Sequence, residues 1–267
     1  DISDADGGVP TGGFVVQNTA GKKITIDGLD KSERTITAGT GITTLFDVQC
    51  EFELKNVTVD YKGTEAAIKI NAATTTSLTQ VQINAEDKGT RSTNAYVKHA
   101  VIDVLAAGTH TLNLSNTDVI MTMPAEGAHT DGSPYQTIIR TNEGLTDSAT
   151  LNPATRTVNI NLTNSTLDAT AAVGRIGIWI TRGTTGTVVL DNSHIKTAHL
   201  KGSGSSVKNR AIYAQTSKQV TPKIDDKVIL TGGSTLSCAN GVADPYDCMI
   251  CVARIGNEYY ETFVEVD

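Results

Sequence analysis

A short pattern recurs along the chain: an apolar residue, any residue, Asn, two further residues and a second apolar residue. Its clearest copies are Leu54–Val59, Leu114–Val119, Leu162–Leu167 and Leu190–Ile195. With the weaker copies included, the central residues lie 24 to 48 residues apart and are Gly28, Asn56, Gln80, Asn116, Asn164, Asn192 and Gly232. A short unit that repeats at such spacing is typical of a solenoid.

The residues around the central Asn predict two short strands joined by a bend. Apolar residues alternate before the bend, as Leu112 and Leu114 do, which indicates a strand with one buried face. Asn and Gly tolerate the left-handed backbone that a sharp bend needs. Alternation then resumes in a shifted phase, as Val57 and Val59 show. We expect the Asn side chains of successive bends to stack as an amide ladder.

A second apolar run follows each copy, for example Ala66–Ile70 and Ile176–Ile180. Three strands per repeat, stacked about 4.8 Å apart, predict an all-β right-handed parallel β-helix, a β-solenoid of about seven turns. The alternative fold is a β-sandwich of many short strands. It does not readily explain the Asn that recurs at one phase of the pattern.

Composition agrees with a single β-solenoid. The 267 residues include 24 Gly, six Pro and only 4% aromatic residues, and no amphipathic helical pattern is evident. Because solenoids grow by adding turns, we expect one domain over residues 1–267. Residues 1–21 would form an N-terminal cap region, and 254–267 a C-terminal edge that continues in a longer parent protein. Since the chain opens with Asp1, we expect any leader or anchor to lie outside this sequence.

The charge balance bears on partners. A formal net charge of −7 and a pI near 5.2 argue against nucleic acid and anionic membrane surfaces. No apolar run approaches the roughly 18 residues of a membrane-spanning helix. We therefore expect no direct membrane insertion of this segment.

The four cysteines leave more than one interpretation open. Cys238 and Cys248 flank a turn-rich stretch and could close a small disulfide loop, or all four could be free core thiols. Cys248 and Cys251 have the spacing of a redox or metal half-site, but no second pair accompanies them. Cys50 lies in phase with buried residues, as an inert thiol would. We predict no metal site and no cofactor; Ca²⁺ held by stacked carboxylates is unsupported, because Asp60 and Asp168 fall several turns apart.

Three long connections are the expected place for function, since binding residues concentrate in variable loops on a rigid scaffold. They span residues 86–99, 121–135 and 196–210, hold three of the five histidines and should leave one edge of the helix. The candidate ligand-binding residues are Arg91, Lys98, His99, His129, Asp131, Tyr135, His199, Lys201, Lys208 and Arg210. The alternative interpretation is that these are ordinary solvated insertions.

One stretch carries a resemblance to a known family. From Thr157 to Ile180 a strand leads into an Asn-Ser-Thr bend and then into a second strand that contains Gly174 and Gly177. This stretch resembles a turn of the β-helical passenger domains of autotransporter-type bacterial surface proteins, and the repeat style covers about residues 22–253. The resemblance implies an extracellular or cell-surface location and an adhesin-like role, in contact with a host glycan or protein. The four cysteines depart from that family.

Two functional classes follow, and we favour the adhesin-like binding domain. The alternative is a polysaccharide lyase or glycoside hydrolase of the pectin-lyase-like fold, which needs paired carboxylates, or a basic residue with Ca²⁺-binding carboxylates. Basic groups on the face of the second apolar runs would come from Lys98, His99, Arg140, Arg175 and Arg182, but no matching carboxylates are evident. A third class, an ice-binding face, is set aside because outward threonines are not expected to line up.

Overall fold

The computed structural model describes residues 2–3, 8–86, 100–122, 136–141, 156–171, 175–181, 184–198, 210–215, 226–239, 248–253 and 262–266. Within these ranges the regular elements are all β-strands, as the sequence predicts. Representative pairings in both sheets are parallel. In the described part of the chain no helix is long and apolar enough to cross a membrane.

The larger sheet, sheet A, has 14 strands in two arms. The first arm contains β3 (Ile24–Asp27), the first halves of β6 (Phe52–Tyr61) and β8 (Thr75–Glu86), β10 (Gly108–Ser115), β13 (Arg156–Thr163), β16 (Thr184–Asp191), β19 (Asp226–Thr231) and β22 (Thr262–Val266). The second arm contains β1 (Ile2–Ser3), β4 (Thr35–Ala38), the second halves of β6 and β8, β11 (Asp118–Thr122), β14 (Thr166–Ala171), β17 (His194–Ala198) and β20 (Thr235–Ala239).

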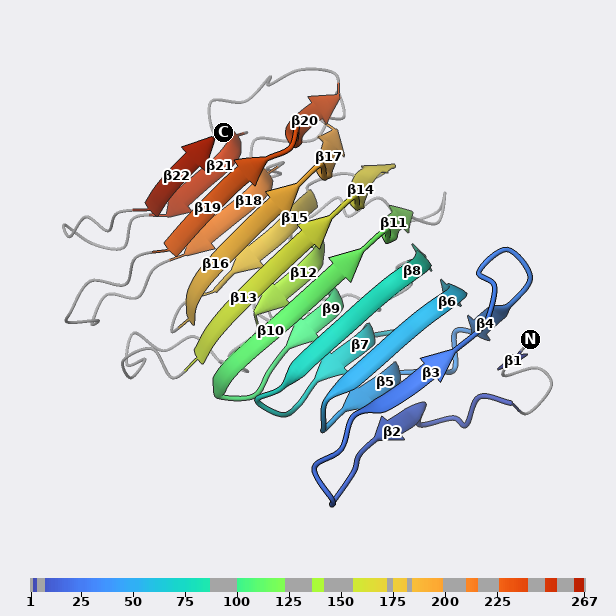
Figure 1. Ribbon diagram of the computed structural model, residues 1–267. Helices are drawn as coiled ribbons and strands as arrows, with labels where there is room; N and C mark the ends of the chain where they lie inside the picture. Colours follow the sequence, from blue (N-terminus) through green and yellow to red (C-terminus); the bar gives the residue numbers. More distant parts are fainter. Residues whose placement is uncertain are drawn as a thin grey trace.

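The smaller sheet, sheet B, lies behind sheet A in Figure 1 and has eight strands. In order they are β2 (Phe14–Val16), β5 (Thr44–Val48), β7 (Ala66–Ile70), β9 (Ala100–Val104), β12 (Gln136–Thr141), β15 (Arg175–Ile180), β18 (Arg210–Gln215) and β21 (Cys248–Ala253). From β3 onward the chain visits the first arm, the second arm and sheet B in a repeating order. Each strand pairs with its counterpart from the previous round, which is compatible with a parallel β-helix.

The core lies between the sheets and is built from stacked rows of like side chains. In the first arm, register brings together Leu54, Leu78, Leu114, Leu162, Leu190 and Leu230. In sheet B the corresponding row is Phe46, Ile68, Ile102, Ile139, Ile178 and Ile212. Leu54, Ile102 and Ile178 are at most 1% exposed. Each such side chain contributes about 1.5–3 kcal/mol on burial, so the rows drive the stacking.

Left-handed backbone is found where the repeated pattern places its bend. The φ angle is positive at Asn56, Gln80, Asn116, Asn164, Asn192 and Gly232. The first copy differs, because there the positive φ of 69° belongs to Leu29 and not to Gly28. Gly28 donates its N–H to the Lys55 carbonyl, and a Cβ on it would lie 2.2 Å from the Asn56 carbonyl oxygen. Close approach of two backbones, not left-handed φ, therefore requires glycine at position 28.

The prediction that the Asn side chains of successive bends form an amide ladder is wrong except for one pair of bends. Asn192 donates from Nδ2 to Asn164 Oδ1 at 2.7 Å. The Asn116 amide instead donates to its neighbour Ser115 at 3.2 Å. Asn56 donates to Asp27 Oδ1 at 2.9 Å, and this bond lowers the pKa of the Asp27 carboxyl.

A buried row of hydroxyls connects the bends in place of the amides. The residue after each of the five bends from Asn56 to Asn192 is buried, and the N–H of Thr117 donates to Ser165 Oγ at 3.1 Å. The N–H groups of Ser165 and Ser193 likewise donate to the hydroxyls of Ser193 and Ser234, both at 3.0 Å. Earlier in the chain Val57 and Val81 hold the same position and are buried. Each hydroxyl thus gives an acceptor to a backbone N–H that water cannot reach.

Candidate binding face

The structure tests few of the predicted ligand-binding residues directly. Arg210 belongs to β18 and is described. The other candidates lie outside the described residues: Arg91, Lys98, His99, His129, Asp131, Tyr135, His199, Lys201 and Lys208. The predicted Cys238–Cys248 disulfide also stays a prediction, because the side chain of residue 248 is not described.

The strands that follow the long connections have their N-terminal ends aligned along one side of sheet B. The three connections lead from β8 to β9, from β11 to β12 and from β17 to β18. In the sheet, Thr137 pairs with Ala100 and with Ile176, and Ile176 pairs with Arg210. The chain therefore re-enters sheet B beside the same edge after each long connection.

A continuous row of residues runs across the outer face of sheet B. Strand alternation turns these residues away from the core, because each directly follows an inward-facing Phe or Ile of sheet B. In register the row is Val15, Asp47, Lys69, Asp103, Arg140, Trp179 and Tyr213. After Val15, the residues from Asp47 to Arg140 form its charged half, and Trp179 and Tyr213 form its aromatic half.

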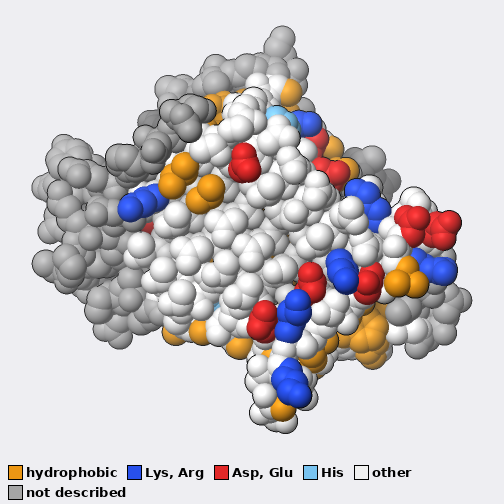
Figure 2. Space-filling model, viewed as in Figure 1, with side chains coloured by type: hydrophobic (Ala, Val, Ile, Leu, Met, Phe, Trp, Pro, Cys, Tyr) orange, Lys and Arg blue, Asp and Glu red, His pale blue; other side chains and the backbone are white. Residues whose placement is uncertain are grey.

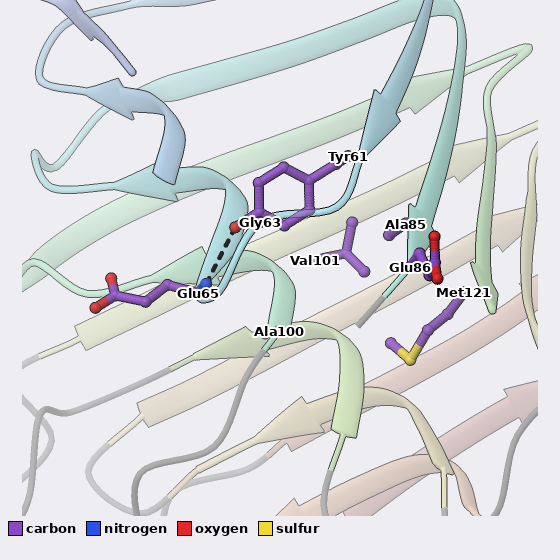
Figure 3. Close-up of a pocket in the computed structure, with 8 residues that line it drawn as sticks. All are labelled: Tyr61, Gly63, Glu65, Ala85, Glu86, Ala100, Val101 and Met121. Atoms are coloured by element: carbon purple, nitrogen blue, oxygen red, sulfur yellow. Dashed lines mark hydrogen bonds between the residues drawn. The ribbon is translucent and has the colours of Figure 1, made fainter. Parts of the chain in front are cut away.

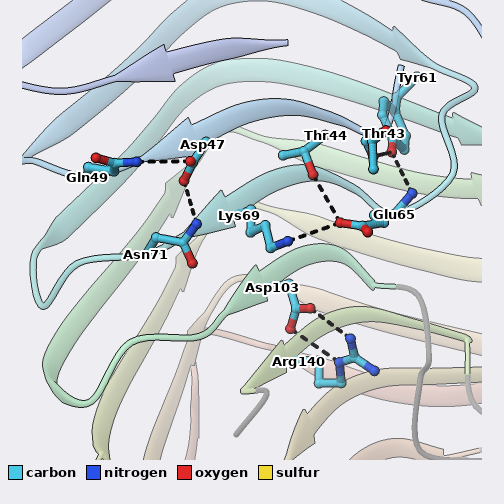
Figure 4. Close-up of polar contacts among 10 residues, drawn as sticks. All are labelled: Thr43, Thr44, Asp47, Gln49, Tyr61, Glu65, Lys69, Asn71, Asp103 and Arg140. Carbon is cyan, nitrogen blue, oxygen red and sulfur yellow. Dashed lines mark hydrogen bonds and ion pairs between the residues drawn. The ribbon is translucent and has the colours of Figure 1, made fainter. Parts of the chain in front are cut away.

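Asp103 and Arg140 form the central ion pair of the charged half (Figure 4). Arg140 donates from Nε to Asp103 Oδ1 at 3.2 Å and from Nη2 to Oδ2 at 2.7 Å. The side chains are only 8% and 5% exposed, respectively. A two-bond contact of this kind is strong and directional, so it fixes both side chains. Sequence reasoning placed Arg140 on this face and missed Asp103, which lies between Ile102 and Val104 in an otherwise apolar strand.

The charges nearer the N-terminal end of the row are also engaged. Lys69 contacts Glu65 at 3.0 Å, and Glu65 also accepts a bond from the Thr44 hydroxyl. Asp47 accepts hydrogen bonds from Gln49 at 3.0 Å and from Asn71 at 2.5 Å. Figure 4 shows these contacts beside the Asp103–Arg140 pair. This half of the face is a self-paired polar network.

The aromatic half of the row has a different character. Trp179 and Tyr213 stack with ring centroids 5.7 Å apart and planes inclined by 27°. With Ile176 they form an apolar cluster separate from the main core. The Arg210 guanidinium lies 4.0 Å from the centroid of the Tyr213 ring. Trp179, Tyr213 and Arg210 are each 8% exposed. We call these three residues the aromatic–arginine cluster.

A small hollow lies at the corner between the second arm and sheet B (Figure 3). It is open to solvent on one side, and its lining residues are Tyr61, Gly63, Glu65, Ala85, Glu86, Ala100, Val101 and Met121. Its two carboxylates already have cationic neighbours, since Glu65 contacts Lys69 and Glu86 contacts Lys62. The remaining lining is largely apolar, so this hollow does not offer a pair of carboxylates ready for acid–base chemistry.

The outer face of the first arm of sheet A is a broad and mostly uncharged polar surface (Figure 2). Thr109, Thr157 and Thr185 stand in register on β10, β13 and β16, so the expectation that outward threonines do not line up is wrong for this row. In the neighbouring row Asn159 separates Thr111 from Thr187. The threonine array is therefore interrupted, and it offers no charged or aromatic group for a specific contact.

Two buried titratable groups lie away from this face. Burial raises the pKa of the Cys50 thiol, in accord with the inert thiol predicted from sequence. Burial lowers the pKa of His110, whose Nε2 lies 2.8 Å from the Ala106 carbonyl oxygen. Arg156 donates to the same carbonyl at 2.8 Å. The nearby guanidinium further disfavours a charged imidazole.

Among the described residues no group of three or more His, Cys, Asp or Glu side chains is arranged to hold a metal ion. Comparisons with protein-family models, with curated proteins and with solved structures found no match to this chain. The class that the structure itself defines is an all-β protein of long parallel sheets. The aromatic–arginine cluster is the strongest candidate site on it.

Proposed function

We propose that this chain is an adhesin-like binding domain, secreted or displayed on a bacterial cell surface, that contacts a host glycan or protein. In this proposal the chain is a single domain, a right-handed parallel β-helix of about seven turns with three strands per turn. The long connections from 86–99, 121–135 and 196–210 form the binding edge together with the outer face of sheet B.

The aromatic–arginine cluster is the observation that carries this proposal. Tyr, Trp and Arg are the residues that most often dominate binding energy at protein interfaces. Here all three types meet on the outer face of one sheet, and Arg210 directly follows a long connection. The charged half of the same face is already self-paired, which favours the aromatic half as the contact surface.

Binding to arrays of host glycans and host surface proteins tests the proposal. Tyr213→Leu keeps apolar volume and removes the ring, and we expect it to weaken binding by about 30-fold or more, as for an interface hot spot. Thr157→Ala, on the exposed face of sheet A, is the matched control and should leave binding unchanged. Deletion of residues 201–208 should spare folding and weaken binding. Full affinity in both the Tyr213 variant and the deletion would refute the proposed face.

The enzymatic alternative is tested on the same preparations. A lyase or hydrolase of the pectin-lyase-like type would shorten polysaccharides or leave unsaturated ends, with or without added Ca²⁺. The Asp103–Arg140 pair does not favour this alternative, because each group is occupied by the other. Intact polysaccharides after incubation, together with array binding, would support the binding role; shortened or unsaturated products would instead establish catalysis.

A further inference from the structure

Three arginine side chains are buried in the described part of the chain, and one of them differs from the others. Arg140 is held by Asp103 through two hydrogen bonds. Arg156 donates to the carbonyl oxygens of Leu105 and Ala106 and to the Thr184 hydroxyl. Arg210 is also buried, at 8% exposure, but its Nε and Nη1 atoms have no hydrogen-bond partner among the described residues.

Unpartnered donors on a buried guanidinium are unfavourable, because the group has lost water without gaining acceptors. A carboxylate would supply these acceptors. A guanidinium binds a carboxylate along either of two edges, Nε with Nη2 or Nη1 with Nη2, and each edge contains one of the two unpartnered nitrogens of Arg210. The Tyr213 ring, 4.0 Å away, orients the guanidinium plane.

The surroundings of Arg210 indicate what carries the carboxylate. Trp179 and Tyr213, each 8% exposed, and the fully buried Ile176 form an apolar, partly aromatic cluster directly beside the charge. Aromatic side chains combine large apolar contact area with a polar edge, which suits a ring that has both an apolar face and polar substituents. We propose that the aromatic–arginine cluster recognises a carboxylate borne on a sugar ring, with Arg210 as the anion-binding residue. This inference rests on the proposed binding function and names its ligand class.

Calorimetric titration with defined sugars tests this site on the full chain. The probes are trigalacturonic acid, its neutral methyl ester, 3′-sialyllactose and lactose. We expect at least one acid to bind tenfold or more tightly than its neutral counterpart, and the preferred acid distinguishes a uronic from a sialic acid. Arg210→Gln should lower affinity for that acid about 10- to 100-fold, as the loss of charged hydrogen bonds implies, and leave the neutral counterpart unaffected. Lys227→Gln, which removes one exposed positive charge from sheet A, should change neither.

A melting curve separates this role from a structural one. Because Arg210→Gln removes a buried charge with unpartnered donors, its melting temperature should equal or exceed that of the wild type. A large fall in melting temperature, equal binding of acid and neutral probe, or no binding of either acid would overturn the carboxylate site. Array binding that is abolished by Tyr213→Leu yet insensitive to Arg210→Gln would refute this inference and leave the proposed function standing.

Discussion

The buried hydroxyl row makes a sharp prediction at Ser165. This side chain is 1% exposed, and its Oγ accepts the Thr117 N–H at 3.1 Å. The same hydroxyl lies within donor distance of the carbonyl oxygens of Thr163 and Leu114, at 2.8 and 3.2 Å. Ser165→Ala removes one atom and leaves the Thr117 N–H buried without an acceptor. The usual penalty for such a group predicts a loss of about 1–3 kcal/mol.

The effect should be local as well as global, because each round of a stacked repeat contacts chiefly its neighbours. We expect Ser165→Ala to lower the denaturant midpoint and to speed amide exchange at Thr117 by about 5- to 150-fold, the same free energy expressed as a rate. Ser165→Thr keeps a hydroxyl at this position and should restore stability. Thr117, at the equivalent position of the preceding round, shows that a threonine fits there. Ser237→Ala, at an exposed position of β20, is the matched control and should change stability by less than about 0.5 kcal/mol. An unchanged midpoint together with unchanged Thr117 protection would show that the hydroxyls do not hold the bends.

Three further predictions use the same denaturation assay. Asn164→Val should lower the free energy of unfolding by about 1–3 kcal/mol, because it forces a β-branched residue into the left-handed region. Asn164→Gly keeps that backbone conformation and should lose only the hydrogen bond from the Asn192 amide. Equal losses in the two variants would argue against backbone strain. Asp103→Ala should lower the free energy of unfolding by about 3–5 kcal/mol, because it leaves Arg140 unpaired. The double variant Asp103→Leu with Arg140→Met should recover most of that loss. Additive losses in the double variant would contradict the pairing. Burial lowers the pKa of His110 from its ordinary 6.5, so near that pH the unfolded chain binds more protons than the folded chain. The free energy of unfolding should therefore fall as pH decreases below about 6.5, and His110→Gln should flatten that dependence between pH 7.5 and 5.5. An unchanged pH dependence in the variant would show that other groups cause it.

The repeated pattern predicts the strands and bends well because both are decided locally. Alternation selects the buried face, and the left-handed position accepts Asn, Gln or Gly, so Asn56, Gln80 and Asn164 follow from short windows of sequence. Gly28 shows where this reasoning stops. Glycine is needed there because the Asn56 carbonyl oxygen of the paired strand lies where a Cβ would be. The position of that oxygen depends on the register between successive rounds of the chain.

The hydroxyl row and the binding face were harder to foresee for the same reason. The N–H of Thr117 needs the hydroxyl of Ser165, which is 48 residues away, and only the observed register joins them. Asp103 looked like an isolated acid in an apolar run until strand pairing placed it opposite Arg140. Trp179 and Tyr213 were visible as scarce aromatic residues, yet their stacking required β15 and β18 to be neighbours.

The outer face of sheet B shows where the scaffold changes character. Along one row of structurally equivalent positions, the charged side chains from Asp47 to Arg140 each contact a polar or oppositely charged neighbour, and then Trp179 and Tyr213 replace the charges. Stacking of the sheets does not require this change, because the inward rows continue unchanged on both sides of it. Arg210 lies beside the aromatic pair with two donors unpartnered among the described residues, while Arg140 in the same face is held by Asp103 through two hydrogen bonds. A departure that the core does not need, and that leaves a buried charge without acceptors, is better explained by a ligand than by folding.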